Sequence, residues 1–197
     1  MNIYEAVKYI VEHISLKWPS HVNYLYGSQR EVQKQLMEWS SDPLMKEEKY
    51  PCVIMFTPID QTRGEDGIKL ITATTVDMVI VTNTEKDYHS WERVQQTYKP
   101  ILWPIYELLI AEMLSSGLFS FSNYRVQHGY KDLFYYSATP AAEQNTFAAV
   151  LDAVELTGLQ LDLLPQGCRQ YAYDAELVHD GIPVVHDDIP VLHKIYI

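Results

Sequence analysis

Two stretches decide the fold, YPCVIMF at residues 50–56 and LITATTVDMVIVT at residues 70–82. Both are rich in β-branched and other apolar residues, which favour strands. Pro51 has no amide donor, so it fits only the start or the edge of a strand. In the second stretch, apolar side chains occupy both faces, which is typical of a strand covered on both sides. We therefore predict that residues 70–82 form the longest strand and lie inside a sheet.

The connection between these stretches is TPIDQTRGEDG at residues 57–67. A proline, two glycines and three acids within it are typical of a turn. Little apolar surface is present to offset the cost of ordering the backbone, about 1–2 kcal/mol per residue. We expect an exposed, mobile hairpin loop, or one that becomes ordered against another chain.

A long helix is predicted over residues 90–116, where apolar and aromatic residues follow the helical repeat. Pro100 and Pro104 each remove an amide donor and crowd the preceding turn, so we expect a bend or a break near them. Gly117 is the natural C-terminal cap. The side chains expected to pack on the sheet are those of Trp91, Tyr98, Ile105 and Leu109.

Two shorter helices are predicted ahead of the sheet. Apolar residues recur at three- and four-residue spacing over residues 3–14, and Trp18 with the proline after it ends this helix. Residues 21–26 are expected to be extended. Ser28 and Glu31 stand at capping-box spacing and predict the start of the second helix.

The last part of the domain is predicted to be β-structure. Two short runs, residues 121–126 and 133–136, flank His128 and Gly129 and indicate a hairpin. Alternating apolar residues predict a final strand over residues 153–163.

Gly158 interrupts the alternation of that final strand, and a change of phase at a glycine predicts a β-bulge. Together these elements predict an α+β fold, with a mostly antiparallel sheet packed by the long proline-kinked helix. Residues 1–164 form the predicted domain. Residues 165–197 form a C-terminal extension that wraps the domain or a neighbouring subunit.

Composition indicates an ordinary globular protein, with 47% hydrophobic and 21% charged residues among 197. The net charge of −11 argues against a broad nucleic-acid-binding surface, which needs concentrated Lys and Arg. No apolar run approaches the roughly 20 residues of a membrane span, and the first residues do not resemble a secretion signal. We expect a protein of the cytoplasm or of a virus particle, with neither membrane nor nucleic acid as a direct partner.

The cysteines predict neither a disulfide framework nor a redox pair. Cys52 lies within an apolar strand signal, where a buried thiol is the usual finding. Cys168 follows a glycine, and its spacing fits no metal or redox motif.

No phosphate-binding loop, dinucleotide-binding glycine pattern or nucleophile elbow is present. We therefore predict no catalytic, cofactor or metal site and no enzymatic activity. The C-terminal histidines and acids fit solvated turns better than a metal site, because their spacing matches no ligand pattern. They are His179, Asp180, His186, Asp187, Asp188 and His193.

Two alternative functions remain open. One is a metal-dependent hydrolase or nuclease that uses Asp77 together with the C-terminal His/Asp cluster. The other is a small-molecule or peptide binding module, in which Trp91, Tyr98 and Trp103 line a pocket under the long helix.

The order of elements resembles the tail-terminator and neck proteins of long-tailed phages. The features that carry the resemblance are a helix before the strand that opens at Pro51, the connection at residues 57–67, the strand at residues 73–81 and the helix packed on the sheet. KPILWPIYEL at residues 99–108 and LDAVEL at residues 151–156 are also similar to prophage-like proteins of Bacteroides-type bacteria. The resemblance covers roughly residues 1–164.

This resemblance implies a non-enzymatic structural protein that caps a tail tube or joins the tail to the head. Members of the group act as rings, so the partners it implies are further copies of the chain and tail-tube or neck proteins. Exposed strand edges and loops are the surfaces through which such subunits pair.

Overall fold

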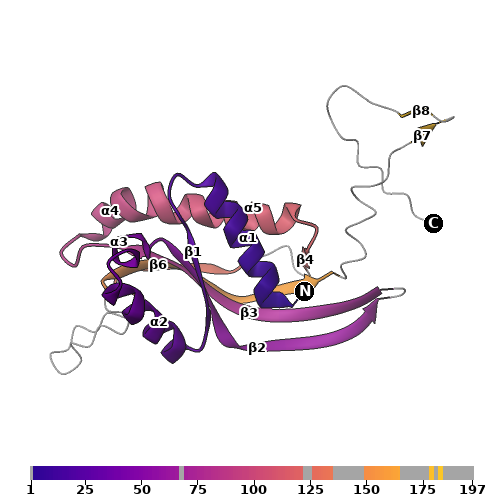
Figure 1. Cartoon of the computed structure of the whole chain (residues 1–197), viewed down its shortest axis with the longest axis horizontal. Helices are drawn as coiled ribbons and strands as arrows, with labels where there is room; N and C mark the ends of the chain where they lie inside the picture. Colours follow the sequence, from indigo (N-terminus) through magenta and orange to yellow (C-terminus); the bar gives the residue numbers. More distant parts are fainter. Residues whose placement is uncertain are drawn as a thin grey trace.

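The computed structural model describes residues 2–66, 69–121, 126–134 and 149–164, together with two short paired strands at 178–179 and 182–183. It is a single α+β domain, as predicted (Figure 1). Its helices are α1 (Ile3–Lys17), α2 (Gln29–Ser41), α3 (Met45–Glu48), α4 (Ser90–Arg93), the π-helical segment η1 (Val94–Leu102) and α5 (Trp103–Ser115). Its strands are β1 (Asn23–Gly27), β2 (Cys52–Asp66), β3 (Lys69–Asn83), β4 (Phe119–Phe121), β5 (His128–Lys131), β6 (Leu151–Leu163), β7 (Val178–His179) and β8 (Ile182–Pro183).

The main sheet has the order β1-β2-β3-β6-β4, with β5 also paired to β6. Only β1 and β2 are parallel; every other pair in this sheet is antiparallel, which confirms the mostly antiparallel prediction. β3 lies inside the sheet, as its two apolar faces predict. β2 and β3 each contain 15 residues, so β3 is the longest strand jointly with β2.

The loop predicted at residues 57–67 is wrong over nearly all of its length. Residues up to Asp66 belong to β2 and pair with β3, from Asp60 opposite Thr75 to Asp66 opposite Lys69. A register shift between Phe56 and Asp60 absorbs the extra residues around Pro58. Pairing with the β-branched residues of β3 therefore overrides the local turn composition. Gly67 lies outside the described residues.

The turn predicted at His128 and Gly129 is also wrong, and residues 122–125 and 135–136 of the predicted hairpin strands lie outside the described residues. His128 and Gly129 lie within β5, which pairs with β6 at Leu156 and Glu155. β4 pairs with the far end of β6, so β4 and β5 lie along the same neighbour instead of pairing with each other. The long β6 has enough backbone donors and acceptors to bind both, and sequence alone does not reveal this choice of partner.

The helical segment runs from Ser90 to Ser115 through α4, η1 and α5. Pro100 lies inside η1, where a wider π-helical turn accommodates a residue that donates no amide hydrogen bond. Tyr98, Ile105 and Leu109 are buried, as predicted, but Trp91 is 67% exposed, so its predicted packing is wrong. The bend near the prolines stays a prediction.

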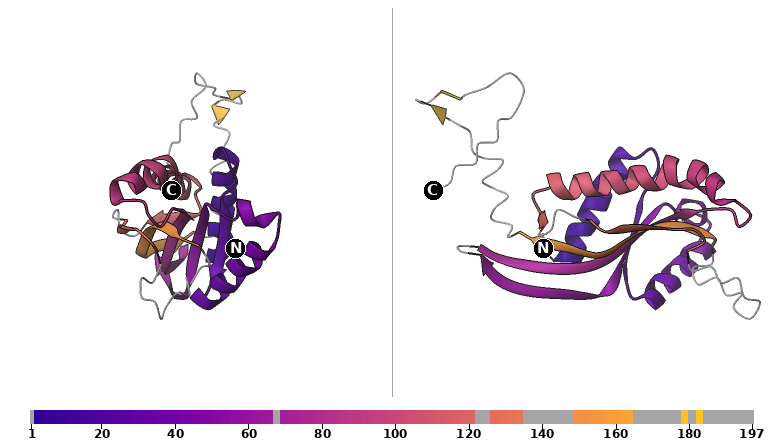
Figure 2. Two further views of the ribbon diagram at one scale, coloured as in Figure 1. Left: turned by 90° about the vertical axis from the view of Figure 1, so that its left-hand side faces the viewer. Right: turned by 180° about the vertical axis from the view of Figure 1, so that it is seen from behind.

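Helices cover both faces of the sheet. α1 and the helix from α4 to α5 pack on one face, against residues such as Met55, Met78 and Leu156. α2 packs on the opposite face, over Ile54 and Val79. Figure 1 shows α5 and α2 on opposite sides of the strands, and Figure 2 shows the same layers from two further directions. The alternation of apolar residues in the strands thus supplies two cores.

Local signals correctly place the helix starts and the bulge. Ser28 and Glu31 form the predicted capping box, with the Ser28 Oγ accepting from the Glu31 amide and the Glu31 side chain accepting from the Ser28 amide. In β6, Thr157 and Gly158 together face the single residue Asp77 of β3, and Gly158 adopts a φ of +62°. This bulge keeps the apolar side chains on both sides of it in the same core.

The C-terminal extension, residues 165–197, lies outside the described residues except for the backbone of β7 and β8. Within the part that the structure describes, no helix combines the length and the hydrophobicity needed to span a membrane.

Candidate functional site

The most distinctive surface is the outer edge of β2. β1 pairs with β2 only as far as Gly27 opposite Phe56. Beyond that point β2 continues to Asp66, and its only strand partner among the described residues is β3. The backbone donors and acceptors on the other side of residues 57–66 therefore form an open sheet edge.

This open edge belongs to a protruding arm. We define the arm as residues 57–66 of β2 together with residues 69–76 of β3. Figure 2 shows the two strands continuing past the ends of the helices. Asp60, Gln61 and Thr62 are exposed on the arm. Asp60 and Pro58 on this edge disfavour indiscriminate strand pairing, because charged residues and prolines are the means by which natural proteins protect open edges.

A second open edge lies at the opposite side of the sheet. β4 pairs with Leu161–Leu163 of β6, which in turn pairs with residues 72–74 of the arm. At this level of the sheet the order is β2, β3, β6, β4, and β4 is the last described strand. At the level of the arm, the described part of the sheet therefore ends in two different edges, one formed by β2 and the other by β4.

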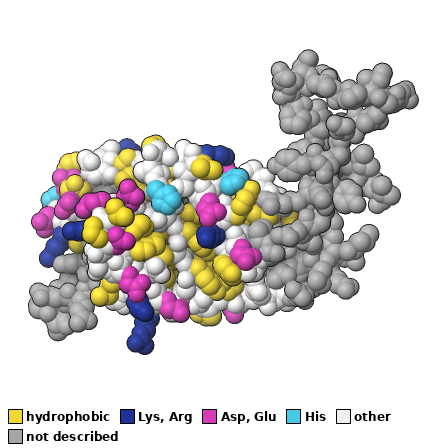
Figure 3. All heavy atoms as spheres, in the orientation of Figure 1, with side chains coloured by type: hydrophobic (Ala, Val, Ile, Leu, Met, Phe, Trp, Pro, Cys, Tyr) yellow, Lys and Arg dark blue, Asp and Glu magenta, His cyan; other side chains and the backbone are white. Residues whose placement is uncertain are grey.

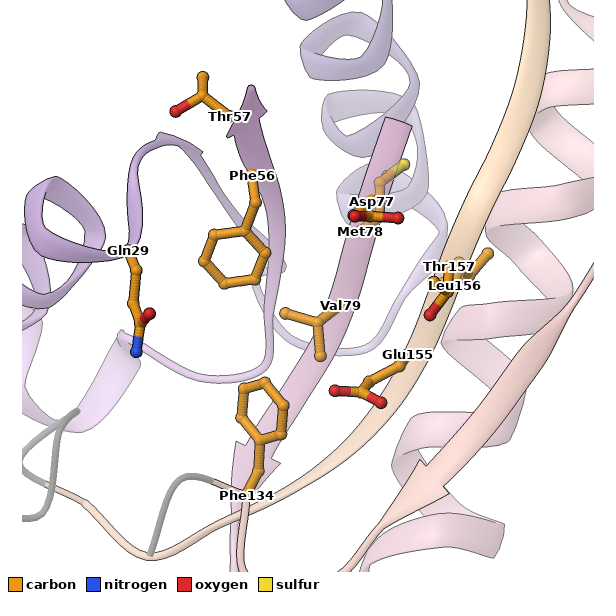
Figure 4. A pocket seen from close by; sticks show the side chains of 10 residues that line it. All are labelled: Gln29, Phe56, Thr57, Asp77, Met78, Val79, Phe134, Glu155, Leu156 and Thr157. Atoms are coloured by element: carbon orange, nitrogen blue, oxygen red, sulfur yellow. The ribbon is translucent and has the colours of Figure 1, made fainter. Parts of the chain in front are cut away.

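A pocket of about 270 Å³ lies on the α2 side of the sheet (Figure 4). Phe56, Val79 and Phe134 give it apolar walls, and Asp77 and Glu155 add carboxylates. Both carboxylates already have structural partners in the sheet. The Asp77 carboxylate accepts from the Gly158 amide at 2.7 Å, and the Glu155 carboxylate lies 3.7 Å from the Lys131 Nζ.

Asp77 is therefore a residue that fastens the β-bulge, and it is exposed. The side chains of the C-terminal His/Asp cluster lie outside the described residues. Among the residues that the structure does describe, no three His, Cys, Asp or Glu side chains form a group that could hold a metal ion.

Two of the aromatic residues considered for a pocket do lie together. The rings of Tyr98 and Trp103 are 6.3 Å apart, and each also contacts Tyr130 of β5. Trp91 is not among these ring contacts. A hollow of about 360 Å³ is lined by Trp103, Tyr130 and three further residues, Tyr106, Glu107 and His128. The helical pattern of residues 90–116 predicts only the lining residues that belong to that helix. It does not predict His128 or Tyr130, because the sequence around His128 favours a hairpin over a strand paired with β6.

Sequence reasoning also missed a buried ion pair between Arg93 and Asp152. Its N–O distance is 2.7 Å, and the side chains are 2% and 0% exposed. Thr97 donates a further hydrogen bond to the Asp152 carboxylate at 2.8 Å. Every polar group of the pair has a protein partner, so its role is structural.

Cys52 is buried in β2, as predicted, and burial raises the pKa of its thiol well above the ordinary range. Cys168 lies outside the described residues. The Cys52 thiol is therefore protonated at neutral pH and is not a candidate nucleophile.

Charged side chains are scattered over the face shown in Figure 3, with acidic groups at many places and hydrophobic groups between them. The exposed large apolar side chains are Tyr4, Leu16, Tyr26, Met37, Leu44, Trp91, Leu114 and Tyr130.

Comparison of the chain with models of known protein families and with curated proteins found no match to either.

Proposed function

We propose that this chain is a non-enzymatic assembly protein of a phage or prophage-like particle, a tail terminator or head–tail joining protein. In this proposal, copies of the chain associate into a ring, and the ring contacts tail-tube or neck proteins. It acts in the cytoplasm of the host cell or as part of the virion. The observation that carries the proposal is the open edge of β2 on the arm.

Strand pairing between subunits fits the two different edges of the sheet. An open edge offers a row of backbone hydrogen-bonding groups, and a strand from another chain satisfies them. If the β2 edge of one subunit pairs with the β4 edge of the next, the contact is head-to-tail, and repeated head-to-tail contacts form a ring when the rotation between neighbours closes. The resemblance to tail-terminator and neck proteins supports the same arrangement.

The experiment measures the molar mass of the full chain by light scattering over a range of concentrations. We expect a molar mass several times the 22.8 kDa of a single chain. Shortening the arm should prevent assembly. In the shortened variant, Asn-Gly replaces residues 62–73, because Gln61 and Thr74 are paired and a two-residue turn closes a hairpin between them.

A second variant, Ser120→Pro, places a residue without an amide donor in the middle of β4. Each variant alone should be a monomer in the head-to-tail arrangement. An equimolar mixture should form a dimer, because one variant retains the β4 edge and the other retains the β2 edge. Gln29→Pro is the control, since the first residue of a helix tolerates proline and α2 is remote from both edges.

A chain that stays monomeric at every concentration, or a mixture that forms no dimer, would contradict ring formation through these edges. The phage assignment has its own test in gene order: neighbouring genes for a portal, capsid or tail-tube protein would support it. Calorimetric titration with zinc, manganese and magnesium addresses the hydrolase alternative, which no contact among the described residues favours.

A further inference from the structure

The hollow between α5 and β5 has the composition of a site for a cation. Trp103, Tyr106 and Glu107 line it from α5, and His128 and Tyr130 line it from β5. Its volume of about 360 Å³ is sufficient for one side chain. The Trp103 and Tyr130 rings are 5.9 Å apart and tilted by 58°, so they present faces and edges to a shared space.

His128 holds the two tyrosines of this site in place. The Tyr106 hydroxyl lies 3.1 Å from the His128 Nδ1, and the Tyr130 hydroxyl lies 3.3 Å from the Nε2. Tyr130 also meets Tyr98 edge-on at 5.6 Å. These contacts position the rings before any ligand binds, which lowers the entropy lost on binding.

Trp103 supplies a donor without a partner. Its Nε1 is buried, and it has no hydrogen-bond partner among the described residues. A buried N–H is normally hydrogen-bonded, because its separation from water is otherwise uncompensated. Because this N–H is buried, a ligand in the hollow contacts the Trp103 ring and not its N–H.

The charge around the hollow is negative. The Glu107 carboxylate lies at its exposed rim, and no Lys or Arg is among the residues that line it. Burial raises the pKa of Tyr106, and the negative charge of Glu107 raises it further. The whole chain carries a net charge of −11, which also attracts a cationic partner.

We infer that this hollow, the aromatic site, binds an arginine or lysine side chain of a partner protein. The cation lies over the faces of Trp103 and Tyr130 and beside Glu107, as cations bind to aromatic rings elsewhere. Arginine is favoured over lysine, because its planar guanidinium group stacks on aromatic rings. This inference does not depend on ring assembly.

The experiment follows the indole N–H signals of the full-length protein by ¹H–¹⁵N NMR. The probe is N-acetyl-arginine N-methylamide, which carries the guanidinium group of an arginine side chain. We expect a saturable shift of the Trp103 signal, assigned with Trp103→Phe, and no shift of the signal from the exposed Trp91. Equal shifts of the two signals, or no shift of the Trp103 signal, would overturn the inference.

Variants test the role of each group. Tyr130→Leu and Glu107→Gln should each weaken binding of the probe about fivefold, whereas Tyr130→Phe should retain it because the ring face remains. Tyr26→Leu is the matched control, since Tyr26 is another exposed tyrosine stacked on a ring, that of Tyr4. Binding that is unchanged in Tyr130→Leu would overturn the site.

A third comparison separates a partner side chain from a free small cation. Tetramethylammonium has the charge but lacks the planar guanidinium group that stacks on aromatic rings. It should bind more weakly than the arginine probe. If it binds at least as tightly, the site takes a free alkylammonium ion and the assignment to a protein side chain is wrong.

Discussion

The Arg93 guanidinium and the Asp152 carboxylate form a fully buried ion pair that fastens the start of the long helix to β6. Arg93 also donates to four groups in the connection between β3 and α4. Those acceptors are the Thr84 Oγ1 and the backbone carbonyls of Glu85, Lys86 and Tyr88. All five donors of the guanidinium group are therefore used. The helix cannot shift along the sheet without breaking this network.

Asp152→Asn should destabilise the fold strongly, because it removes the negative charge and leaves the Arg93 cation buried. We expect a loss of about 3–5 kcal/mol in the free energy of unfolding, measured with urea. Glu12→Gln is the control, because the Lys8–Glu12 pair is exposed and such pairs contribute about 1 kcal/mol or less. Similar losses in both variants would show that burial of the pair is not what stabilises the fold.

The bulge in β6 gives a second prediction. Gly158 has a φ of +62°, and a side chain in this left-handed region costs about 1–2 kcal/mol. Gly158→Ala should lower the free energy of unfolding by that amount. In contrast, Gly129→Ala should change it by less than about 0.5 kcal/mol, since Gly129 has an ordinary φ and a methyl group on its Cα would have open space around it.

The aspartate opposite the bulge gives a third prediction. Asp77→Ala should cost about 1 kcal/mol, because the Gly158 amide loses its acceptor and is left to water. The same urea titration measures it. Asp77→Asn retains an acceptor oxygen and should be closer to the original protein. If alanine and asparagine variants are equally stable, the contact contributes nothing to the bulge.

Sequence patterns succeed here where the cause is local. The capping box at Ser28 and Glu31 and the bulge at Gly158 each depend on residues a few positions apart, so spacing alone reveals them. The arm is not predicted, because residues 57–66 have the composition of a turn while their strand conformation depends on pairing with β3.

Contacts between distant residues are also beyond sequence reasoning. Arg93 and Asp152 are 59 positions apart, and neither residue type suggests burial. The aromatic site joins Trp103 on α5 to His128 and Tyr130 on β5, and only the pairing of β5 with β6 brings these residues together. A correct prediction of this site requires the sheet topology.

The buried thiol gives a fourth prediction. In a Cys168→Ser variant, Cys52 is the remaining cysteine, and its raised pKa and burial protect it from reaction. We expect almost no modification by a thiol reagent at pH 8 in the native state and complete modification in urea. Rapid reaction of the native protein would mean that β2 opens readily next to β1.

The last prediction concerns the pH dependence of the cap of α2. Hydrogen bonds from the Ser28 hydroxyl and amide lower the pKa of Glu31 from its ordinary value of 4.5. Because the folded-state pKa is the lower one, ionised Glu31 stabilises the fold above its ordinary pKa, and this contribution is lost as the pH falls through the folded-state value.

Glu31→Gln should therefore lower the melting temperature at pH 7 and differ less from the original protein as the pH falls and Glu31 becomes protonated. Ser28→Ala should cost about 1 kcal/mol and return the pKa of Glu31 toward its ordinary value, measured by NMR titration. Glu38→Gln is the control, because Glu38 lies on the same helix in an exposed pair with Lys34. A difference between the Glu31→Gln variant and the original protein that stays constant from pH 7 to pH 3 would show that the charge of Glu31 does not stabilise this cap.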